Sequence, residues 1–411
     1  MGVQAAAQAT PNGAFRLHDG DTVVFYGDSI TEQKLYTSDI EDFVLTRFPD
    51  LHIHFVHSGV GGDKVSGGAG GPIDMRLTRD LFAYRPAMIT VMLGMNDGYY
   101  GPLEPGIRTT YEDGYRHIVE LIRAQLPQST LTLLKPSPYD DVTRTPYFSP
   151  GYNATMVQFG DFVGKLAEQN HALVADLNSP VVDALTKAKS KDRPLSTALI
   201  RDRVHPGTGI HWLMAEAVLS AWNAPDLVAS ANIDASRAVA ADAKNTVITN
   251  LHRTRNSLSW TQRDMALPLP FPAPAADPFL SLVLQVSDLE QRLDQEMLLV
   301  SGLAEGSYEL QIDDRPVGTF TADQMAKGVN LATLETPMIS QARLVAFDTD
   351  CKNEIENLRF AFARETRDAQ TDDTIARLDT AIQAAIDQQR NDAKPVAHRF
   401  ALVYMNNAAS K

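Results

Sequence analysis

A serine that directly follows an apolar run is the first residue of this sequence that could do chemistry. Residues 23–26 are β-branched or aromatic, which is typical of a buried parallel strand, and Gly27, Asp28 and Ser29 follow at once. A serine at such a strand-to-helix turn lies at the carboxyl edge of an open sheet, where these folds bind their ligands. Its hydroxyl becomes a nucleophile only when a base lies within hydrogen-bond reach. Alone, the same tripeptide is more often a turn that caps a helix.

His205 is the best candidate for that base among the ten histidines of the chain. Asp202 stands three residues before it, a spacing at which the carboxylate can orient the imidazole ring and stabilise the imidazolium. Together with Ser29, these residue types indicate acyl transfer. His52 and His54 share one face of a predicted strand, but no third ligand is obviously paired with them, and no metal site is predicted there.

Acyl transfer also needs hydrogen-bond donors that stabilise the oxyanion of the tetrahedral intermediate. The backbone N–H groups of Ser29 and Gly62 and the side-chain amide of Asn96 are the three predicted donors. Glycine suits position 62 because the backbone must approach the substrate closely without a Cβ atom in the way. Gly59 and Gly61 lie in the same segment and remain alternatives for this role.

Strands and helices that could position these residues alternate along the first half of the chain. This alternation predicts a parallel sheet with helices on both faces. All the polar stretches named above fall where strands end, and therefore at one edge of that sheet. The predicted strands are 22–26, 52–56, 87–93, 130–134 and 172–175, and the predicted helices are 35–48, 74–84, 108–125, 153–170 and 208–222.

These stretches, in this order, resemble the four blocks of the SGNH (GDSL-type) hydrolase family. The resemblance covers residues 15–223 and implies a flavodoxin-like α/β/α fold and a metal-free ester hydrolase that needs no cofactor. It implies Ser29 as nucleophile, His205 as base and Asp202 as the residue that orients the base. It likewise implies Ser29, Gly62 and Asn96 as oxyanion donors. The matching residues are Gly27-Asp28-Ser29, Gly62, Gly94-Met95-Asn96-Asp97 and Asp202-Arg203-Val204-His205-Pro206.

Further residues beside the blocks have predicted roles. Asp28 is expected to brace the turn before Ser29 through backbone hydrogen bonds, and Asp97 to brace the loop of Asn96 in the same way. Four side chains near the same rim are predicted to contact substrate, with packing as the alternative: His57, Asp63, Tyr99 and Tyr139. Tyr100 lies on this rim beside Tyr99.

The composition excludes several classes of function. A formal charge of −14 and a pI near 5.1 argue against nucleic acid and anionic membranes as partners. No apolar run reaches the ~18 residues that a membrane span needs. A single cysteine, Cys351, excludes an intrachain disulfide and a cysteine-based zinc site. The alanine-rich tract 1–11 could be the remainder of an export signal, so we expect a secreted or periplasmic protein, with a cytoplasmic one as the alternative.

Beyond Pro225 the sequence changes in character. Residues 224–275 are predicted to form an alanine-rich helical linker followed by a proline-rich connector. Residues 276–411 are predicted to be a mixed region, with β-structure over 297–350, a polar helix over 365–393 and a final strand from His398. This half could be a glycan-binding or oligomerisation module, or an appendage packed against the catalytic domain.

The function predicted from the sequence is hydrolysis of short-chain esters through an acyl-enzyme on Ser29. Related enzymes with a β-rich appendage often remove acetyl groups from glycans, so the resemblance suggests a carbohydrate acetyl esterase. A lipid or general acyl esterase, or a thioesterase, is the alternative. The expected partner is a small-molecule or glycan ester, and a homo-oligomer is a further expectation.

Overall fold

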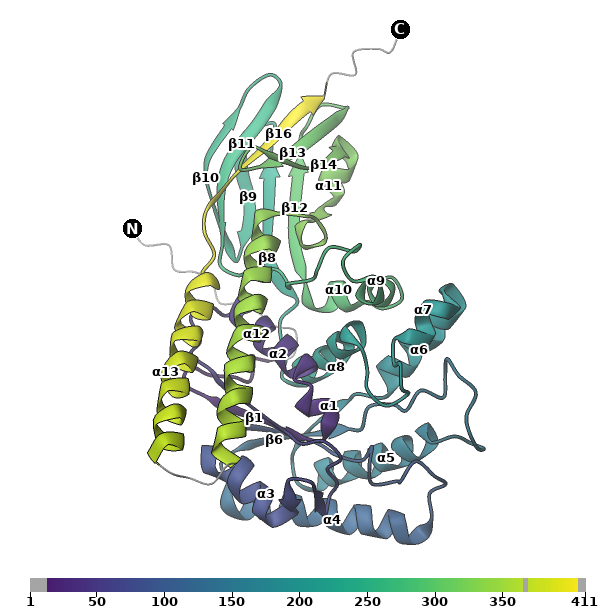
Figure 1. Ribbon diagram of the computed structural model, residues 1–411. Coiled ribbons are helices and arrows are strands. Elements are labelled where there is room, and N and C mark those ends of the chain that lie inside the picture. Colours follow the sequence, from purple (N-terminus) through teal and green to yellow (C-terminus); the bar gives the residue numbers. More distant parts are fainter. Residues whose placement is uncertain (1–12, 365–368, 406–411) are drawn as a thin grey trace.

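The computed structural model describes residues 13–364 and 369–405. They form an α/β domain, a β-sandwich above it, and a helical hairpin that runs from the sandwich down the side of the α/β domain (Figure 1). The N-terminal tract on which the export prediction rests lies outside the described residues. Within the described ranges, no helix is both long and apolar enough to cross a membrane.

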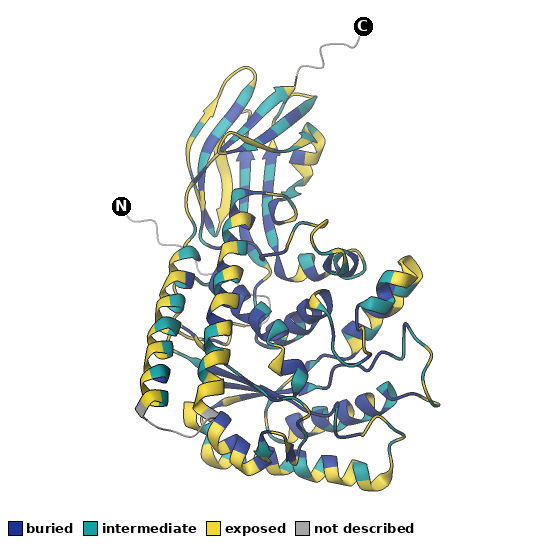
Figure 2. Ribbon diagram, viewed as in Figure 1, coloured by how far each residue is buried: buried dark blue, intermediate teal, exposed yellow. Residues whose placement is uncertain are grey.

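A five-stranded parallel sheet forms the centre of the α/β domain. Its strands are β1 (Thr22–Gly27), β2 (His54–Gly59), β5 (Met88–Met92), β6 (Thr130–Lys135) and β7 (Leu173–Asp176). The strand order is β2-β1-β5-β6-β7, so the carboxyl ends of β1 and β5 flank the switch point at which such sheets bind ligands. The strands are apolar because both faces are covered, and every residue of β5 is buried (Figure 2). The predicted α/β fold is confirmed.

Helices lie on both faces of this sheet (Figure 1). One face carries α2 (Leu35–Arg47) and α8 (Thr208–Ala221), and the other carries α3 (Ile73–Asp80), α4 (Pro105–Gln125) and α5 (Asn153–Gln169). Shorter elements are α1 (Ser29–Glu32), β3 (Gly67–Gly68), β4 (Gly71–Pro72) and the 3₁₀ helix η1 (Phe82–Tyr84). The sequence analysis assigned no element to α6 (Ser179–Lys191) or α7 (Arg193–Ala198). Two of the four buried residues of α6 are alanines, which give a weak periodic signal.

The second part is a sandwich of two sheets, ordered β15-β12-β8-β9 and β10-β11-β16-β13-β14. Apolar side chains from both sheets form one core, in which Trp260 and Phe400 stack with ring centroids 5.2 Å apart. The first sheet contains β8 (Leu227–Asp234), β9 (Val239–Lys244), β12 (Gln295–Ser301) and β15 (Val329–Asn330). The second contains β10 (Thr246–Arg253), β11 (Ser257–Asp264), β13 (Ser307–Ile312), β14 (Arg315–Thr321) and β16 (His398–Met405), and α11 (Ala322–Lys327) and η2 (Leu331–Thr333) lie beside the sheets.

The helical prediction within residues 224–275 is wrong, because residues 227–264 form β8 to β11. Alanine favours helices intrinsically, but the pairing of β8 with β12 and the burial of alternate residues decide the structure here. In β11 the alternation is visible, since Leu258 and Trp260 point into the core while Ser257 and Ser259 are half-buried. β9 is exposed along its whole length and therefore lacks this signal (Figure 2).

The proline-rich connector and the two helices after it belong to the core of the α/β domain. Leu269 and Phe271 are buried in that core, and the rings of Phe271 and Trp212 meet edge to face at 5.0 Å. Leu280 and Val283 of α9 (Pro278–Leu284) and residues of α10 (Leu289–Leu293) join the same cluster. The predicted boundary near residue 224 is thus not a boundary of packing, since residues up to 293 complete the first core.

The hairpin consists of α12 (Pro337–Arg364) and α13 (Ala369–Asp392). α13 agrees with the predicted polar helix, whereas α12 begins inside the stretch predicted as β-structure. The hairpin docks on α2 through buried polar contacts: Lys352 forms an ion pair with Glu41, and Thr349 donates a hydrogen bond to Asp42. The ion pair and a hydrogen bond from His57 hold the pKa of Glu41 at about 2, although burial alone would raise it. The C-terminal region is therefore tied directly to the α/β domain.

Candidate active site

Ser29 is the first residue of α1 and follows β1 by one residue. Asp28 has extended backbone angles and caps the helix, because its carboxylate accepts a hydrogen bond of 3.0 Å from the backbone N–H of Ile30. The predicted bracing role of Asp28 is confirmed. At the first position of the helix, the N–H of Ser29 has no partner within the helix and points away from it.

His205 and Asp202 lie in one hydrogen-bonded line with Ser29. The Nε2 atom of His205 is 2.9 Å from the hydroxyl of Ser29, and its Nδ1 atom is 2.6 Å from a carboxylate oxygen of Asp202. The other carboxylate oxygen of Asp202 accepts the backbone N–H groups of Val204 and His205. Burial raises the pKa of Asp202, but these hydrogen bonds outweigh it and hold the pKa below its usual value. A carboxylate at Nδ1 fixes the tautomer in which Nε2 can accept the serine proton.

Arg203 anchors the loop that carries His205. Its backbone is in the left-handed region, with a φ of +73°, and its side chain is buried. The guanidinium donates to the carbonyl oxygens of Asp140 and Thr145 and stacks on Tyr147 at 4.2 Å from the ring centroid. Sequence reasoning missed this residue, because its partners lie about 60 positions earlier in the chain.

Gly59, which ends β2, and Gly61 and Gly62, which follow it, differ in what a Cβ atom would contact at each position. A Cβ atom on Gly59 would lie 2.0 Å from the backbone nitrogen of Glu32, so Gly59 allows β2 to pack against α1. A Cβ on Gly61 would approach the carboxylate of Glu32 to 2.9 Å and the Cβ of Ser29 to 4.0 Å. Gly62 has a φ of +71°, and a Cβ there would meet no protein atom. Backbone conformation therefore favours glycine at position 62.

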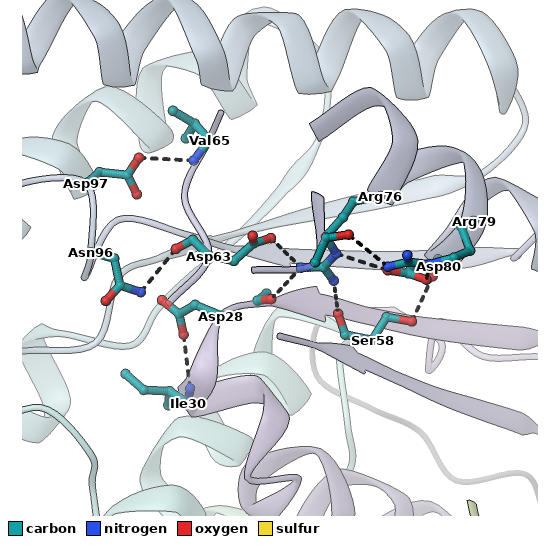
Figure 3. Close-up of polar contacts among 12 residues, drawn as sticks. Asp28, Ile30, Ser58, Asp63, Val65, Arg76, Arg79, Asp80, Asn96 and Asp97 are labelled. Atoms are coloured by element: carbon teal, nitrogen blue, oxygen red, sulfur yellow. Dashed lines mark hydrogen bonds and ion pairs between the residues drawn. The ribbon is translucent and has the colours of Figure 1, made fainter. Parts of the chain in front are cut away.

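The side-chain amide of Asn96 is held from both ends. Its Nδ2 atom donates one hydrogen to the carbonyl oxygen of Asp63 at 3.0 Å, and its oxygen accepts the hydroxyl of Tyr100 at 2.8 Å. These contacts fix the orientation of the amide and leave the second Nδ2 hydrogen for a ligand. Nearby, Asp97 accepts the backbone N–H of Val65 at 3.0 Å, as its predicted bracing role requires (Figure 3). Two hydrogen bonds thus join the loops after β2 and β5.

The comparison with protein families agrees with this geometry. The sequence model of the GDSL-like lipase/acylhydrolase family matches residues 25–213. Residues 25–213 belong to this family. The match confirms the resemblance seen in the sequence, and the protein is a carboxylic ester hydrolase.

Two known proteins are similar to this esterase. An acetylxylan esterase from Geobacillus stearothermophilus is 24% identical over an alignment of 226 positions that covers 50% of this chain and 94% of that protein. The solved structure of a gut microbial diltiazem-metabolizing enzyme is 25% identical and has a TM-score of 0.82, with 95% of this chain and 99% of that chain covered. The second likeness extends over the sandwich and the hairpin, so this three-part architecture also occurs in a solved structure.

Arg76 of α3 lies beside Asp63 and contacts the ends of the strands that carry the esterase site (Figure 3). The side chain is fully buried and donates hydrogen bonds to the carbonyl oxygens of Ser58 (2.6 Å) and Gly27 (3.5 Å), at the ends of β2 and β1. It also forms ion pairs with Asp63 and Asp80. Arg76 was not among the predicted site residues. Its place next to Leu77, on the buried side of a predicted helix, is a sequence signal for a buried and paired arginine.

Two predicted substrate contacts do not reach the site. The side chain of His57 is 1% exposed and is held by the hydroxyl of Thr37 at 2.7 Å and by Glu41, and burial lowers its pKa. Asp63 is completely buried, and its carboxylate is paired with Arg76. Both side chains find their polar partners inside the protein instead of at the rim, although one carboxylate oxygen of Asp63 has no partner among the described residues.

The tyrosines at the rim differ in exposure. Tyr99 is exposed, with the Lys64 ammonium 4.7 Å from its ring centroid. Tyr139, the other predicted contact, is 7% exposed and packs edge to face on Tyr152 at 5.3 Å. Tyr100 contacts both of these buried rings as well as Asn96, and it is therefore the tyrosine nearest to the chemistry.

No metal site accompanies these residues in the described part of the chain, where no three His, Cys, Asp or Glu side chains are grouped suitably. Two buried carboxyl groups near the site, those of Asp28 and Asp97, have raised pKa values. Burial raises the pKa of Asp28 and of Asp97 to about 7, and the negative charge of Asp63 raises both pKa values further. One oxygen of Asp97 has no hydrogen-bond partner among the described residues, which adds to the cost of its charge.

Replacing Asp28 by asparagine is expected to make the esterase more stable at pH 8 by a few kcal/mol and to change little at pH 4. The ordinary pKa of this carboxyl is 3.8, so between pH 4 and 7 the folded state binds a proton that the unfolded state has lost. Stability therefore falls as the pH rises through this window, and the neutral amide removes that loss while still capping the helix. Urea unfolding of both proteins at pH 4, 6 and 8 measures the effect. Asp50→Asn, on the exposed surface, is the control, and a difference that does not grow with pH would contradict the prediction.

Proposed function

We propose that the protein is a serine esterase that removes short acyl groups, chiefly acetyl, from carbohydrate esters. The observation that carries the proposal is the hydrogen-bonded line from Ser29 through His205 to Asp202. Its serine follows β1, and the fixed amide of Asn96 follows the neighbouring strand β5, so both lie at the same edge of the sheet.

In the proposed reaction, the hydroxyl oxygen of Ser29 attacks the ester carbonyl carbon while Nε2 of His205 takes the hydroxyl proton. The oxyanion accepts hydrogen bonds from the N–H groups of Ser29 and Gly62 and from Nδ2 of Asn96. The intermediate collapses, and the alcohol leaves with the proton from His205. Water activated by the same imidazole then hydrolyses the acyl-enzyme, and Asp202 stabilises the imidazolium in both halves of the reaction.

Two observations support the choice of substrate. The related protein from Geobacillus stearothermophilus is an acetylxylan esterase, and 94% of its length is matched. The ring centroids of Tyr100, Tyr139 and Tyr152 are 5.2 to 6.2 Å apart, and Tyr100 contacts Asn96. We infer that these rings occupy space that a long acyl chain would need. A short acyl group fits this crowding better than a fatty acyl chain.

Acetate release tests the proposal. The wild-type enzyme is expected to cleave p-nitrophenyl acetate at least tenfold faster, in kcat/KM, than the octanoate ester, and to release acetate from acetylated xylo-oligosaccharides. Diltiazem is a further test substrate, because the similar solved structure is that of a diltiazem-metabolizing enzyme. A preference for the octanoate ester would overturn the short-acyl proposal in favour of a lipid esterase. Cleavage of p-nitrophenyl acetate without acetate release from the saccharides would overturn the carbohydrate part alone.

A further inference from the structure

A cavity of about 450 Å³ lies between the edge strand β2 and the hairpin. Its walls combine residues of the α/β domain with residues of α12 and α13 that lie about 300 positions later in the chain. The volume falls within the range of small-ligand sites, which is roughly 300–1,000 Å³. No step of the proposed reaction uses this cavity.

The cavity adjoins the nucleophile. Glu32, which lines it, ends α1, the four-residue helix that begins with Ser29. A Cβ atom on Gly61 would lie 2.9 Å from the Glu32 carboxylate and 4.0 Å from the Cβ of Ser29, so the serine and the cavity wall face the same glycine. Lys34, two residues further, also lines the cavity and has a left-handed backbone with a φ of 60°.

Ion pairs join the walls of the cavity and neutralise the cationic side chains that line it. Lys34 lies 3.7 Å from Glu356 of α12, and Arg359 of α12 is paired with Asp379 of α13. Both cationic side chains of the lining are thus neutralised within the walls, while Glu32 adds one carboxylate. This arrangement disfavours a phosphate or another anionic ligand. It suits a neutral, polar ligand whose hydroxyl groups donate hydrogen bonds to the Glu32 carboxylate.

The remaining lining groups can bind hydroxyl groups and the apolar face of a ring. Among the described residues, the side chains of His54, Tyr84 and Asn357 have no hydrogen-bond partner, and all three are exposed at the cavity. Tyr84 and Phe360 are each 40% exposed and present aromatic surface. A pyranose ring has hydroxyl groups at its edge and C–H groups on its faces, so it needs this combination of amide, imidazole and aromatic surface.

We propose that this cavity is a distal subsite that binds a sugar unit of an acetylated oligosaccharide while the acetyl ester of another unit lies at Ser29. The proposal rests on the carbohydrate part of the proposed function. It assigns to the hairpin a direct role in substrate binding, in which residues of α12 contact the saccharide.

Chain-length dependence of the kinetics tests the proposal. Tyr84→Ala and Asn357→Ala are expected to raise KM at least fivefold for an acetylated xylohexaose and to leave kcat unchanged, because the lost contacts are the same in ground state and transition state. For p-nitrophenyl acetate and acetylated xylobiose, which lack a distal sugar unit to place in the cavity, KM and kcat should not change. Leu358→Ala, which alters an exposed residue next to Asn357 outside the cavity, is the matched control and should behave as wild type.

Equal kinetics of wild type and both cavity variants on the hexaose would overturn the proposal, and so would an equal loss on all three substrates. Should the wild type cleave p-nitrophenyl acetate but no acetylated saccharide, direct binding decides separately. Isothermal titration of unacetylated xylohexaose into Ser29→Ala should then give binding that Tyr84→Ala weakens, and absence of binding would overturn the subsite.

Discussion

Replacing Ser29 by alanine is expected to lower kcat for p-nitrophenyl acetate by about 10⁴-fold or more and to leave the fold intact. The serine hydroxyl is the group that forms the covalent bond, and no neighbouring side chain can replace it at 2.9 Å from Nε2 of His205. Its removal creates no buried cavity, since the residue is partly exposed. Steady-state kinetics and thermal unfolding of the same preparation measure both outcomes.

The matched control is Ser66→Ala, which removes an exposed hydroxyl from the loop after β2 and should retain wild-type activity. A fluorophosphonate inhibitor should transfer its phosphonyl group to Ser29 with loss of fluoride, so mass spectrometry should show that group on the wild type and on Ser66→Ala but not on Ser29→Ala. Combining Ser29→Ala with His205→Ala should cost little more than either change alone, because the two residues act as one unit. Retention of more than one tenth of kcat by Ser29→Ala would exclude the acyl-enzyme on this residue.

The first half of the fold was predictable because local signals there agree with tertiary packing. β1 and β5 are apolar along their length because helices cover both faces of the sheet. The apolar residues of α4 recur at helical spacing. The residues that line the switch point follow these strands directly, so Ser29 and Asn96 could be placed at one edge from the sequence alone. Both predictions needed only the order of strands and helices.

The second half lacked such agreement. β8 contains two alanines, which favour helices, and three polar residues, which favour neither helix nor strand, so its pairing with β12 decides that it is a strand. The docking of α12 depends on Lys352 meeting Glu41, two residues 311 positions apart. No periodicity within either segment encodes such a contact, and so β8 to β11 and α12 were not predicted, whereas the β-structure after residue 297 and the final strand from His398 were.

The same limit applies within the site. The chemistry-bearing residues were readable from their types and spacing, but the residues that hold them were not. Arg203 fixes the His205 loop, and Tyr100 fixes the amide of Asn96, through contacts that only the folded chain creates. Arg76 is the extreme case, since it contacts the ends of both β1 and β2 and the loop that carries Gly62. Its loss should therefore affect stability and catalysis together.

Arg76→Met is expected to lower the free energy of unfolding by about 3–5 kcal/mol, because it leaves the carboxylate of Asp63 buried without its cation. Asp80 should contribute less to this loss, since Arg79 also contacts it. We also expect kcat for p-nitrophenyl acetate to fall at least tenfold at a temperature where the variant is folded. The reason is that the carbonyl of Asp63 orients Asn96, so a displaced loop misaligns two of the three proposed oxyanion donors. Urea unfolding and steady-state kinetics measure the two effects.

The double variant Arg76→Met/Asp63→Asn separates the causes. Neutralising Asp63 removes the unpaired buried charge, so most of the lost stability should return, whereas the carbonyl oxygens of Gly27 and Ser58 still lack their donor. If the charge alone matters, kcat should return as well. If the guanidinium also aligns the strand ends, kcat should stay low in a stable protein, and Arg76→Lys, which keeps the charge but not the planar fork, should share that defect. Unchanged stability in Arg76→Met would contradict the prediction, because a completely buried carboxylate cannot lose its paired cation without cost.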